Sequence, residues 1–423
     1  MNGVVPLSQA RDEKLFGAKA VGLGAATRAD LVVPPGIALS GELVEKVAGG
    51  DQAAVDLLTA AVGSLGGPLA ARSSCVDEDG AEASFAGQHL TILNVASKDD
   101  LAGAVREIWW SANSDSAIGY RRRVGLFSRP SVGVVVQVLL DPEVAGVMFT
   151  TNPINGADER VIEAAFGLGE AVVAGLVIPD HYRLTRSGDV LEASPGVKKI
   201  AIRAAVDGGT REEKVDPELV ERLCIGDAEL EQLSALAGRC EEVYGPGRDI
   251  EWAFSSGRLY LLQCRAVTKA VSRVPTASSD AEAVGPGGAV ATSLLARVPL
   301  FGDLDADEAD QVAGLFKERR FCAGETIVKE GASGAAFFVI GTGEATVSIR
   351  ARPIRTLGPG DYFGEIALID EGARSATVTA TTDLVCHGLT LWDFQPLVQQ
   401  NPAISWKLLQ ALAKKLRGAQ GTA

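Results

Sequence analysis

A stretch of small, flexible residues in the second half of the chain most limits how it can fold. Residues 269–291 read KAVSRVPTASSDAEAVGPGGAVA, rich in Pro, Gly, Ser and Ala and without a hydrophobic period. This composition is typical of a linker, because it builds no apolar helix face and fills no core. The 423 residues are also too many for one compact core. We therefore predict a domain at 1–268, a linker at 269–291 and a second domain at 292–423.

The region before the linker alternates short β-branched segments with amphipathic helical ones. Residues 132–140 (VGVVVQVLL) and 146–151 (GVMFTT) predict strands. Residues 100–112 and 228–244 carry apolar side chains at helical spacing. This mixture predicts an α+β or α/β fold for the first domain, of which we expect α+β.

The region after the linker has a different pattern. Residues 321–391 break into short apolar segments separated by glycines, which is typical of a β-roll or barrel. Residues 401–417 then place apolar side chains at helical spacing, so we expect a closing helix. The separating glycines are Gly324, Gly331, Gly334, Gly341, Gly343, Gly358 and Gly360.

Charge and composition exclude several classes of partner. A formal net charge of -14 argues against nucleic acid, whose phosphates need dense Lys and Arg. No apolar segment approaches the roughly 18 residues of a membrane span, and the first residues show no signal peptide. The six cysteines form no Cys-x-x-Cys pair, so reduced thiols are expected. We expect a cytoplasmic protein with no nucleic-acid or membrane partner.

Residues 249–265 (DIEWAFSSGRLYLLQCR) predict a hairpin that carries polar side chains. Asp249 and Glu251 share one face of its first strand, and Gln263 and Arg265 share one face of the second. Both pairs face together if the loop holds three or five residues. Carboxylates beside an amide and a guanidinium suit Mg²⁺ and a polyphosphate. A solvated face with a cross-strand ion pair explains the same residues.

Three other segments carry possible chemistry. Residues 17–24 (GAKAVGLG) predict a glycine-rich turn around Lys19, although the spacing is not that of a P-loop. Residues 71–94 predict a loop that holds Arg72, two serines and an acidic cluster. Residues 162–175 predict a strand, a glycine turn and a small-residue helix. Taken alone, each also fits an ordinary surface loop or tight helix–sheet packing.

In this order, these segments resemble the ATP-binding domain of the phosphoenolpyruvate synthase, pyruvate phosphate dikinase and rifampicin phosphotransferase family, from about Phe16 to Thr268. The resemblance implies an ATP-grasp fold with two subdomains, and ATP with Mg²⁺ as ligands. The implied ATP-binding residues are Lys19, Arg72, Gly87, Thr91, Gln137, Asp249, Glu251, Gln263 and Arg265.

The resemblance also implies a role for several of these side chains. Lys19, Arg72 and Arg265 are the implied catalytic residues, because their counterparts contact the nucleotide phosphates. Glu251 and Gln263 match the pair that ligates the metal. Gly87 and Thr91 are expected along the loop over the phosphates, and Gln137 near the adenine. The R-S-S segment of the family, usually R-S-S-A-T-x-E-D, is RSSCVDED at residues 72–79, so its Thr is replaced by Val76.

In the family, ATP is cleaved to AMP as a histidine on a separate carrier domain is phosphorylated. The three histidines here are His89, His181 and His387, and none has the Thr-x-His context of the carrier histidine. We therefore expect a partner protein that bears the phosphohistidine domain. Two alternatives stay open: a non-catalytic regulator that binds ATP or AMP and a cyclic nucleotide, and an antibiotic phosphotransferase subunit.

Residues 363–380 (FGEIALIDEGARSATVTA) predict a short turn or helix, a loop and a strand around Arg374. Alone, they also fit a β-roll turn with a surface ion pair. The segment resembles the phosphate-binding cassette of cyclic-nucleotide-binding domains, over Ser293 to about Arg417. The resemblance implies that a cyclic nucleotide, cAMP or cGMP, binds and regulates the chain. Ser375 does not separate the two nucleotides, and we expect cAMP. The implied contacts are Glu365 to the ribose 2′-hydroxyl, Arg374 to the cyclic phosphate, and Gly364, Ser375 and Ala376 nearby.

Overall fold

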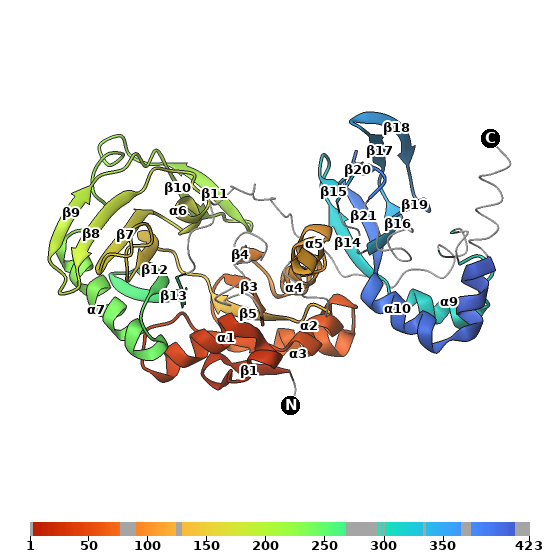
Figure 1. Ribbon diagram of the computed structural model, residues 1–423, viewed down its shortest axis with the longest axis horizontal. Coiled ribbons are helices and arrows are strands. Elements are labelled where there is room, and N and C mark those ends of the chain that lie inside the picture. The colour runs from red at the N-terminus through yellow and green to blue at the C-terminus, as the bar shows by residue number, and fades with distance from the viewer. Residues whose placement is uncertain are drawn as a thin grey trace. The chain divides into compact units, whose positions relative to one another are not determined.

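The computed structural model describes residues 3–76, 90–123, 129–267, 295, 298, 301–332, 336–364 and 374–410. The chain forms two compact units (Figure 1). The first contains residues 1–44, 56–108 and 131–284; the second contains residues 45–55, 109–130 and 285–423. The second unit therefore includes two segments that precede the expected linker in sequence. The expected domain boundaries stay a prediction.

The first unit contains a five-stranded antiparallel sheet in the order β1-β2-β5-β3-β4. Its central strand is the predicted strand at 132–140, in which Val134, Val135 and Val136 are fully buried. Full burial follows from the position between two strands, since β-branched side chains pack well on a pleated surface. The strands are β1 (Val4–Pro6), β2 (Gly36–Leu39), β3 (Leu69–Cys75), β4 (Thr91–Val95) and β5 (Val132–Val138).

A second sheet in the same unit has six strands in the order β13-β12-β6-β7-β8-β9. Met148, Ile162 and Trp252 form its core together with Leu233 of helix α7 (Asp227–Tyr244), which confirms the predicted helix. The strands are β6 (Val144–Phe149), β7 (Glu159–Phe166), β8 (Asp180–Thr185), β9 (Val190–Ser194), β12 (Arg248–Ser255) and β13 (Arg258–Ala266). Strands β10 (Ile200–Ala204) and β11 (Thr210–Lys214) form a separate pair.

Helix α1 (Glu13–Arg28) contacts β3 and β5 of the first sheet and β13 of the second. The turn expected over residues 17–24 is wrong beyond Gly17, because residues 18–24 are helical and Gly17 alone is non-helical, with φ 79°. The other helical elements before the expected linker are η1 (Leu7–Gln9), α2 (Gly41–Ala48), α3 (Gln52–Ala61), η2 (Val62–Ser64), α4 (Lys98–Ala112), α6 (Glu170–Val173) and, in the second unit, α5 (Asp115–Arg123). The predictions of a helix at 100–112 and of a strand, turn and helix at 162–175 are confirmed.

The hairpin of β12 and β13 closes with two residues, so the expected loop of three or five is wrong. Ser256 and Gly257 both adopt positive φ, as a two-residue hairpin turn requires. A β-bulge at Leu262 adds one residue on the second strand and shifts the register. Glu251 therefore lies opposite Gln263, and Asp249 opposite Arg265. The expected facing of the polar pairs is correct, but the bulge produces it.

The second unit contains two four-stranded antiparallel sheets, β14-β21-β16-β19 and β15-β20-β17-β18, in agreement with the predicted roll. Phe337, Val339 and Leu389 form a core with Ile404 and Leu408 of the closing helical residues 402–410. Helices α9 (Ala306–Ala313) and α10 (Leu391–Gln400) complete it. The strands are β14 (Lys317–Phe321), β15 (Thr326–Val328), β16 (Ala336–Thr342), β17 (Ala345–Ile349), β18 (Arg352–Leu357), β19 (Tyr362–Phe363), β20 (Thr377–Ala380) and β21 (Leu384–Thr390).

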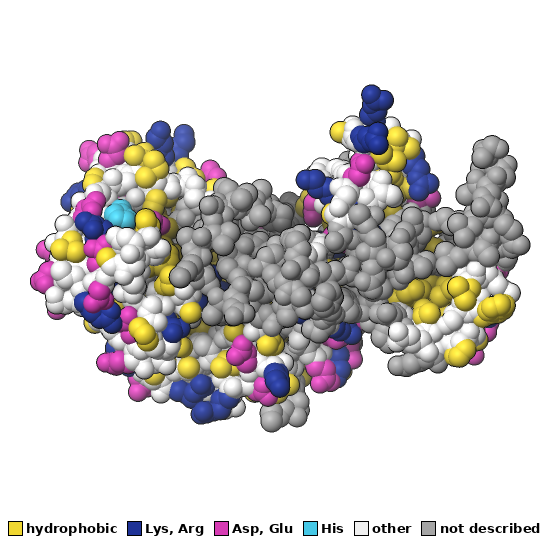
Figure 2. Space-filling model, in the orientation of Figure 1, with side chains coloured by type: hydrophobic (Ala, Val, Ile, Leu, Met, Phe, Trp, Pro, Cys, Tyr) yellow, Lys and Arg dark blue, Asp and Glu magenta, His cyan; other side chains and the backbone are white. Residues whose placement is uncertain are grey.

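The described surface of the first unit is mixed in charge. Figure 2 shows acidic and basic side chains interspersed over its visible face. None of the helices in the described part of the chain is long and apolar enough to cross a bilayer.

Candidate functional site

Arg72 of strand β3 joins the two sheets of the first unit. Its Nη1 donates to the Leu262 carbonyl oxygen at 2.6 Å, and its Nη2 donates to Glu251 Oε2 at 3.0 Å and to Gln263 Oε1 at 2.8 Å. The loop expected over residues 71–94 is therefore wrong at Arg72, which belongs to a strand. The strand holds the backbone of Arg72 in place, so its guanidinium contacts the β12–β13 hairpin at fixed positions. Three of the predicted site residues converge here.

Arg265 and Asp249 face each other across the hairpin. Asp249 Oδ2 accepts from Arg265 Nη2 at 2.7 Å and from Nε at 2.9 Å. The Asp249 side chain is 7% exposed and that of Arg265 is 24% exposed. This is the cross-strand ion pair of the alternative interpretation, and it also holds one edge of the guanidinium in place. Asp249 acts here as an anchor for Arg265.

Lys19 belongs to helix α1 and contacts the residue that follows Arg72. The residue is buried, and Nζ donates to the Ser73 carbonyl oxygen at 2.7 Å. The Ala20 amide donates to Ser74 Oγ at 3.0 Å. A Cβ atom on Gly17 would lie 2.0 Å from the Ser74 carbonyl oxygen, so only glycine permits this close approach of helix and strand. The two serines of the R-S-S segment thus bind the helix that carries Lys19.

Two further predicted residues lie on the same sheet, and one lies outside the described residues. Thr91 pairs with Arg72 on the neighbouring strand β4. Gln137 is buried on β5, where its Nε2 donates to the Pro34 carbonyl oxygen at 3.0 Å. Gly87 belongs to residues 77–89, which the structure does not describe. The binding roles of all these residues stay predictions.

The oxygens of Glu251 and Gln263 fit part of a Mg²⁺ shell. They are hard donors on adjacent strands, brought together by one guanidinium. No group of three or more His, Cys, Asp or Glu residues that could hold a metal occurs among the described residues. Mg²⁺ commonly takes one or two protein ligands and completes its shell with phosphate oxygens and water, so a two-residue donor set suits a metal that arrives with ATP.

The thiol of Cys264, between Gln263 and Arg265, is not a candidate nucleophile. Its hydrogen bond with Cys240 and its burial raise the pKa of the Cys264 thiol far above the usual range. A thiol held protonated in this way is inert at neutral pH. The chemistry of the site therefore rests on its cations, carboxylates and amide.

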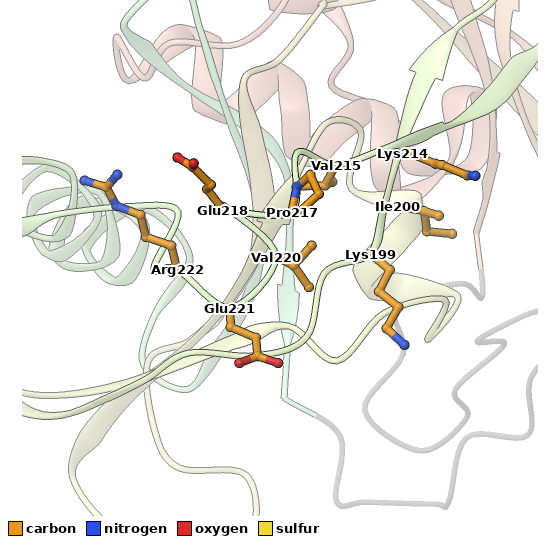
Figure 3. A pocket seen from close by; sticks show the side chains of 9 residues that line it. All are labelled: Lys199, Ile200, Lys214, Val215, Pro217, Glu218, Val220, Glu221 and Arg222. Carbon is orange, nitrogen blue, oxygen red and sulfur yellow. The ribbon is translucent and has the colours of Figure 1, made fainter.

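A pocket of about 830 Å³ lies elsewhere in the first unit, between the pair β10–β11 and residues 215–222 (Figure 3). The side chains of Lys199, Lys214 and Arg222 are exposed and point in different directions. Ligand sites usually have a few polar groups that converge on one point. This pocket lacks that convergence, and we assign it no function.

In the second unit, Arg374 is buried and contacts the first residue of strand β16. Its Nη2 donates to the Ala336 carbonyl oxygen at 2.7 Å, and its Nη1 lies 3.5 Å from the Gly364 carbonyl oxygen. Gly364 has φ +83°, and a Cβ atom there would lie 2.4 Å from Arg374 Nη1. Ser375 is exposed and Ala376 half-buried directly after it. Glu365, the predicted ribose contact, lies outside the described residues.

Comparison with protein families identifies the region that contains Arg72 and the β12–β13 hairpin. The model of the pyruvate phosphate dikinase AMP/ATP-binding domain matches residues 38–283. The chain belongs to this family. The matched span includes Arg72, Gln137, Glu251 and Arg265. A second model, that of the cyclic nucleotide-binding domain, matches residues 318–401, which include Arg374.

Relatives within the family support the same assignment. A probable phosphoenolpyruvate synthase of Archaeoglobus fulgidus is 40% identical over 202 residues, which are 47% of this chain and 27% of that protein. A rifampicin phosphotransferase of Bacillus cereus is 35% identical over 201 residues, 47% of this chain and 23% of that one. The chain thus spans about a quarter of the length of these relatives.

The second region was also compared with solved structures. The catabolite activator protein of Thermus thermophilus is 32% identical, over 29% of this chain and 60% of that one, with a TM-score of 0.26. Such a low score carries no argument about shape, so the assignment of this region rests on the family model.

Sequence reasoning missed one residue at each site. Ser74, whose hydroxyl fixes helix α1, stood in the quoted R-S-S segment but was given no role. Asp115, which contacts Arg374, lies 259 residues before it. No local pattern connects residues so far apart, so the sequence carried no signal for that contact.

Proposed function

We propose that the chain is the ATP-binding component of a phosphotransferase, and that it phosphorylates a histidine carried by a partner protein. The observation that supports it most is the meeting of Arg72 with Glu251 and Gln263, because it links a cation on one sheet to a metal-binding oxygen pair on the other. Membership of the AMP/ATP-binding family points to the same chemistry.

The proposed reaction uses the cations to bind the polyphosphate. In the structure these cations donate to backbone carbonyl and carboxylate oxygens: Lys19 to Ser73, Arg72 to Leu262 and Arg265 to Asp249. Phosphate oxygens are stronger acceptors for a guanidinium fork, so ATP can take over part of these bonds. Glu251 and Gln263 would hold Mg²⁺, which neutralises charge on the phosphates when bound. Release of AMP requires that the bond between the α- and β-phosphates breaks. Of the two phosphoryl groups that leave AMP, one is transferred to the histidine nitrogen and the other to water, which releases inorganic phosphate.

The histidine acceptor is proposed on a partner because the described histidines are poorly suited to the role. His181 lies within β8, paired with Glu163 on one side and Ser194 on the other. His387 is half-buried in β21, between β14 and β16. Both are held inside sheets, whereas a carrier must reach the nucleotide and then an acceptor.

The second unit is proposed to bind a cyclic nucleotide, cAMP in preference to cGMP, and to regulate the first. Buried Arg374 is the group that supports this, since a guanidinium in a shielded position pairs strongly with a phosphate. The match of residues 318–401 to the cyclic nucleotide-binding model supports the ligand class. We place the protein in the cytoplasm, where ATP and cyclic nucleotides are available.

The test incubates the full chain with ATP, Mg²⁺ and candidate carrier proteins, and measures AMP and acid-labile phosphohistidine. We expect AMP only with the right carrier, and none with Glu251→Gln or Arg265→Met. Clean ATP binding without AMP in any pairing would favour the non-catalytic regulator instead. AMP formed with rifampicin as the only acceptor would favour the antibiotic phosphotransferase. For the second unit, Arg374→Ala should abolish cAMP binding in calorimetry and leave ATP binding intact.

A further inference from the structure

We propose that Asp115 occupies Arg374 as an internal substitute for the cyclic phosphate, so that a cyclic nucleotide binds only when residues 109–123 are released. Both residues belong to the second unit. The inference rests on the proposed cyclic-nucleotide function of that unit.

The contact has the geometry of a guanidinium that recognises a two-oxygen anion. Arg374 Nε donates to Asp115 Oδ2 at 2.8 Å, and Nη2 donates to Asp115 Oδ1 at 3.0 Å. The side chains are 4% and 15% exposed. Two parallel N–H···O bonds to one anion are the arrangement that arginine also makes with phosphate. The carboxylate and a phosphate therefore require the same edge of the guanidinium.

Among the described residues, the other donors of Arg374 face two backbone carbonyl oxygens. Nη2 also donates to the Ala336 carbonyl oxygen, and Nη1 is directed at the Gly364 carbonyl oxygen. These bonds fix the plane of the guanidinium against β16. An incoming phosphate must consequently displace Asp115 to obtain a bidentate contact.

Residues close to Asp115 in the sequence also pack against strands of the second unit. The indole N–H of Trp110 donates to the Glu318 carbonyl oxygen at 3.0 Å, and the ring lies 5.7 Å from that of Phe338. A Cβ atom on Gly388 would lie 2.5 Å from the Trp110 ring, so only glycine admits the ring there. Lys317 Nζ lies 4.7 Å from the centre of the Trp109 ring. The segment is held by shape as well as by charge.

The chain connects this segment directly to the ATP-binding unit. Residues 109–112 continue helix α4, and residue 130 is separated by one residue, Ser131, from Val132, the first residue of β5, which carries Gln137. Release of the segment would thus remove restraints at both ends from elements of the first unit. Because the carboxylate and the cyclic phosphate exclude each other, the cyclic nucleotide selects the released state. That differential binding supplies a physical route for regulation.

The deciding experiment measures cAMP binding to the full chain by calorimetry. Asp115→Asn keeps the shape but removes the competing charge, so cAMP should bind roughly 10- to 100-fold more tightly than to wild type. Asp115→Glu keeps a carboxylate and should remain close to wild type. Asp207→Asn removes one exposed negative charge from the turn between β10 and β11, and should leave the affinity unchanged.

A second variant and a second readout protect the test from misfolding. Trp110→Phe loses the indole hydrogen bond without touching Arg374, and should tighten cAMP binding about fivefold. Hydrogen exchange of amides 109–123 should speed up when wild type is saturated with cAMP. Equal affinities of wild type, Asp115→Asn and Trp110→Phe, with binding still lost in Arg374→Ala, would overturn the inference alone. Binding that ignores Arg374→Ala, or no binding in any variant, would overturn the cyclic-nucleotide pocket itself.

Discussion

Arg72 Nη2 lies 3.0 Å from Glu251 Oε2, although 179 positions separate the two residues in the sequence. The pair joins β3 of the five-stranded sheet to β12 of the six-stranded sheet. A guanidinium held by a carboxylate, an amide oxygen and a carbonyl oxygen can exchange partners for phosphate oxygens. We propose that ATP binding replaces part of this contact.

Glu251→Gln should weaken Mg²⁺-dependent ATP binding. The amide keeps the side-chain shape and one acceptor oxygen, but loses the charge that would attract Mg²⁺ and hold Arg72. We expect roughly 10- to 100-fold lower affinity for a non-hydrolysable ATP analogue with Mg²⁺, measured by calorimetry. The same substitution at exposed Glu212, in β11, should have no effect. Equal affinities for the two variants would contradict the metal-binding role of Glu251.

Gly17→Ala should destabilise the first unit. The residue has φ +79°, and its new Cβ would collide with the Ser74 carbonyl oxygen, so helix α1 must move away from β3. We expect a loss of about 1–3 kcal/mol in the free energy of unfolding, measured with urea. Gly22→Ala is the matched control in the same helix. It meets no atom within 4 Å and should stabilise by about 0.5–1 kcal/mol.

Lys198→Met should destabilise the six-stranded sheet. Lys198 and Asp180 form an ion pair in which both side chains are fully buried. Asp180 also accepts from the amides of Gly196 and Cys224, at 2.7 Å each. Removing the lysine leaves a buried carboxylate without its counter-charge, which costs about 3–5 kcal/mol. The double variant Lys198→Met with Asp180→Asn should recover part of this loss in urea unfolding. No recovery would show that the pair acts only through packing.

The stability of the second unit should fall in mild acid because of His387. Burial lowers the pKa of His387 below its usual 6.5, and nearby Glu318 opposes this only in part. Between the folded and unfolded pKa values the unfolded chain binds the extra proton, so the free energy of unfolding decreases as the pH falls below about 6.5. The decrease ends below the folded pKa. His387→Gln should flatten the slope in calorimetry from pH 5 to 8, whereas His181→Gln should keep it.

The sequence predicted several strands and helices of the first unit and the facing of the polar residues at 249–265. Apolar patterns predicted strands at 132–140 and 146–151 and helices at 100–112 and 228–244. The structure has these elements at 132–138, 144–149, 98–112 and 227–244. These patterns succeed because burial on one face requires a period that the sequence must display. The polar residues at 249–265 were likewise visible, since a strand exposes alternate side chains in a fixed order.

The failures have physical reasons as well. The glycines of residues 17–24 suggested a turn, but Gly24 serves close packing: a Cβ there would lie 2.5 Å from the Leu7 carbonyl oxygen. The contact of Asp115 with Arg374 depends on how the whole second unit folds. Neither close backbone approach nor long-range pairing leaves a periodic trace in the sequence.

The bulge at Leu262 also determines which changes the hairpin can tolerate. It divides the hairpin into two sections whose side-chain alternation is out of step by one residue. The register of the section that carries Glu251 and Gln263 therefore differs from that of the section that ends in the Ser256–Gly257 turn. Lengthening the turn by two residues would leave the site in phase, whereas pairing Leu262 regularly with Glu251, without the bulge, would turn Gln263 and Arg265 to the opposite face. The one bulge residue thus sets the register of the site, and the hairpin turn is a suitable position for inserting a longer loop.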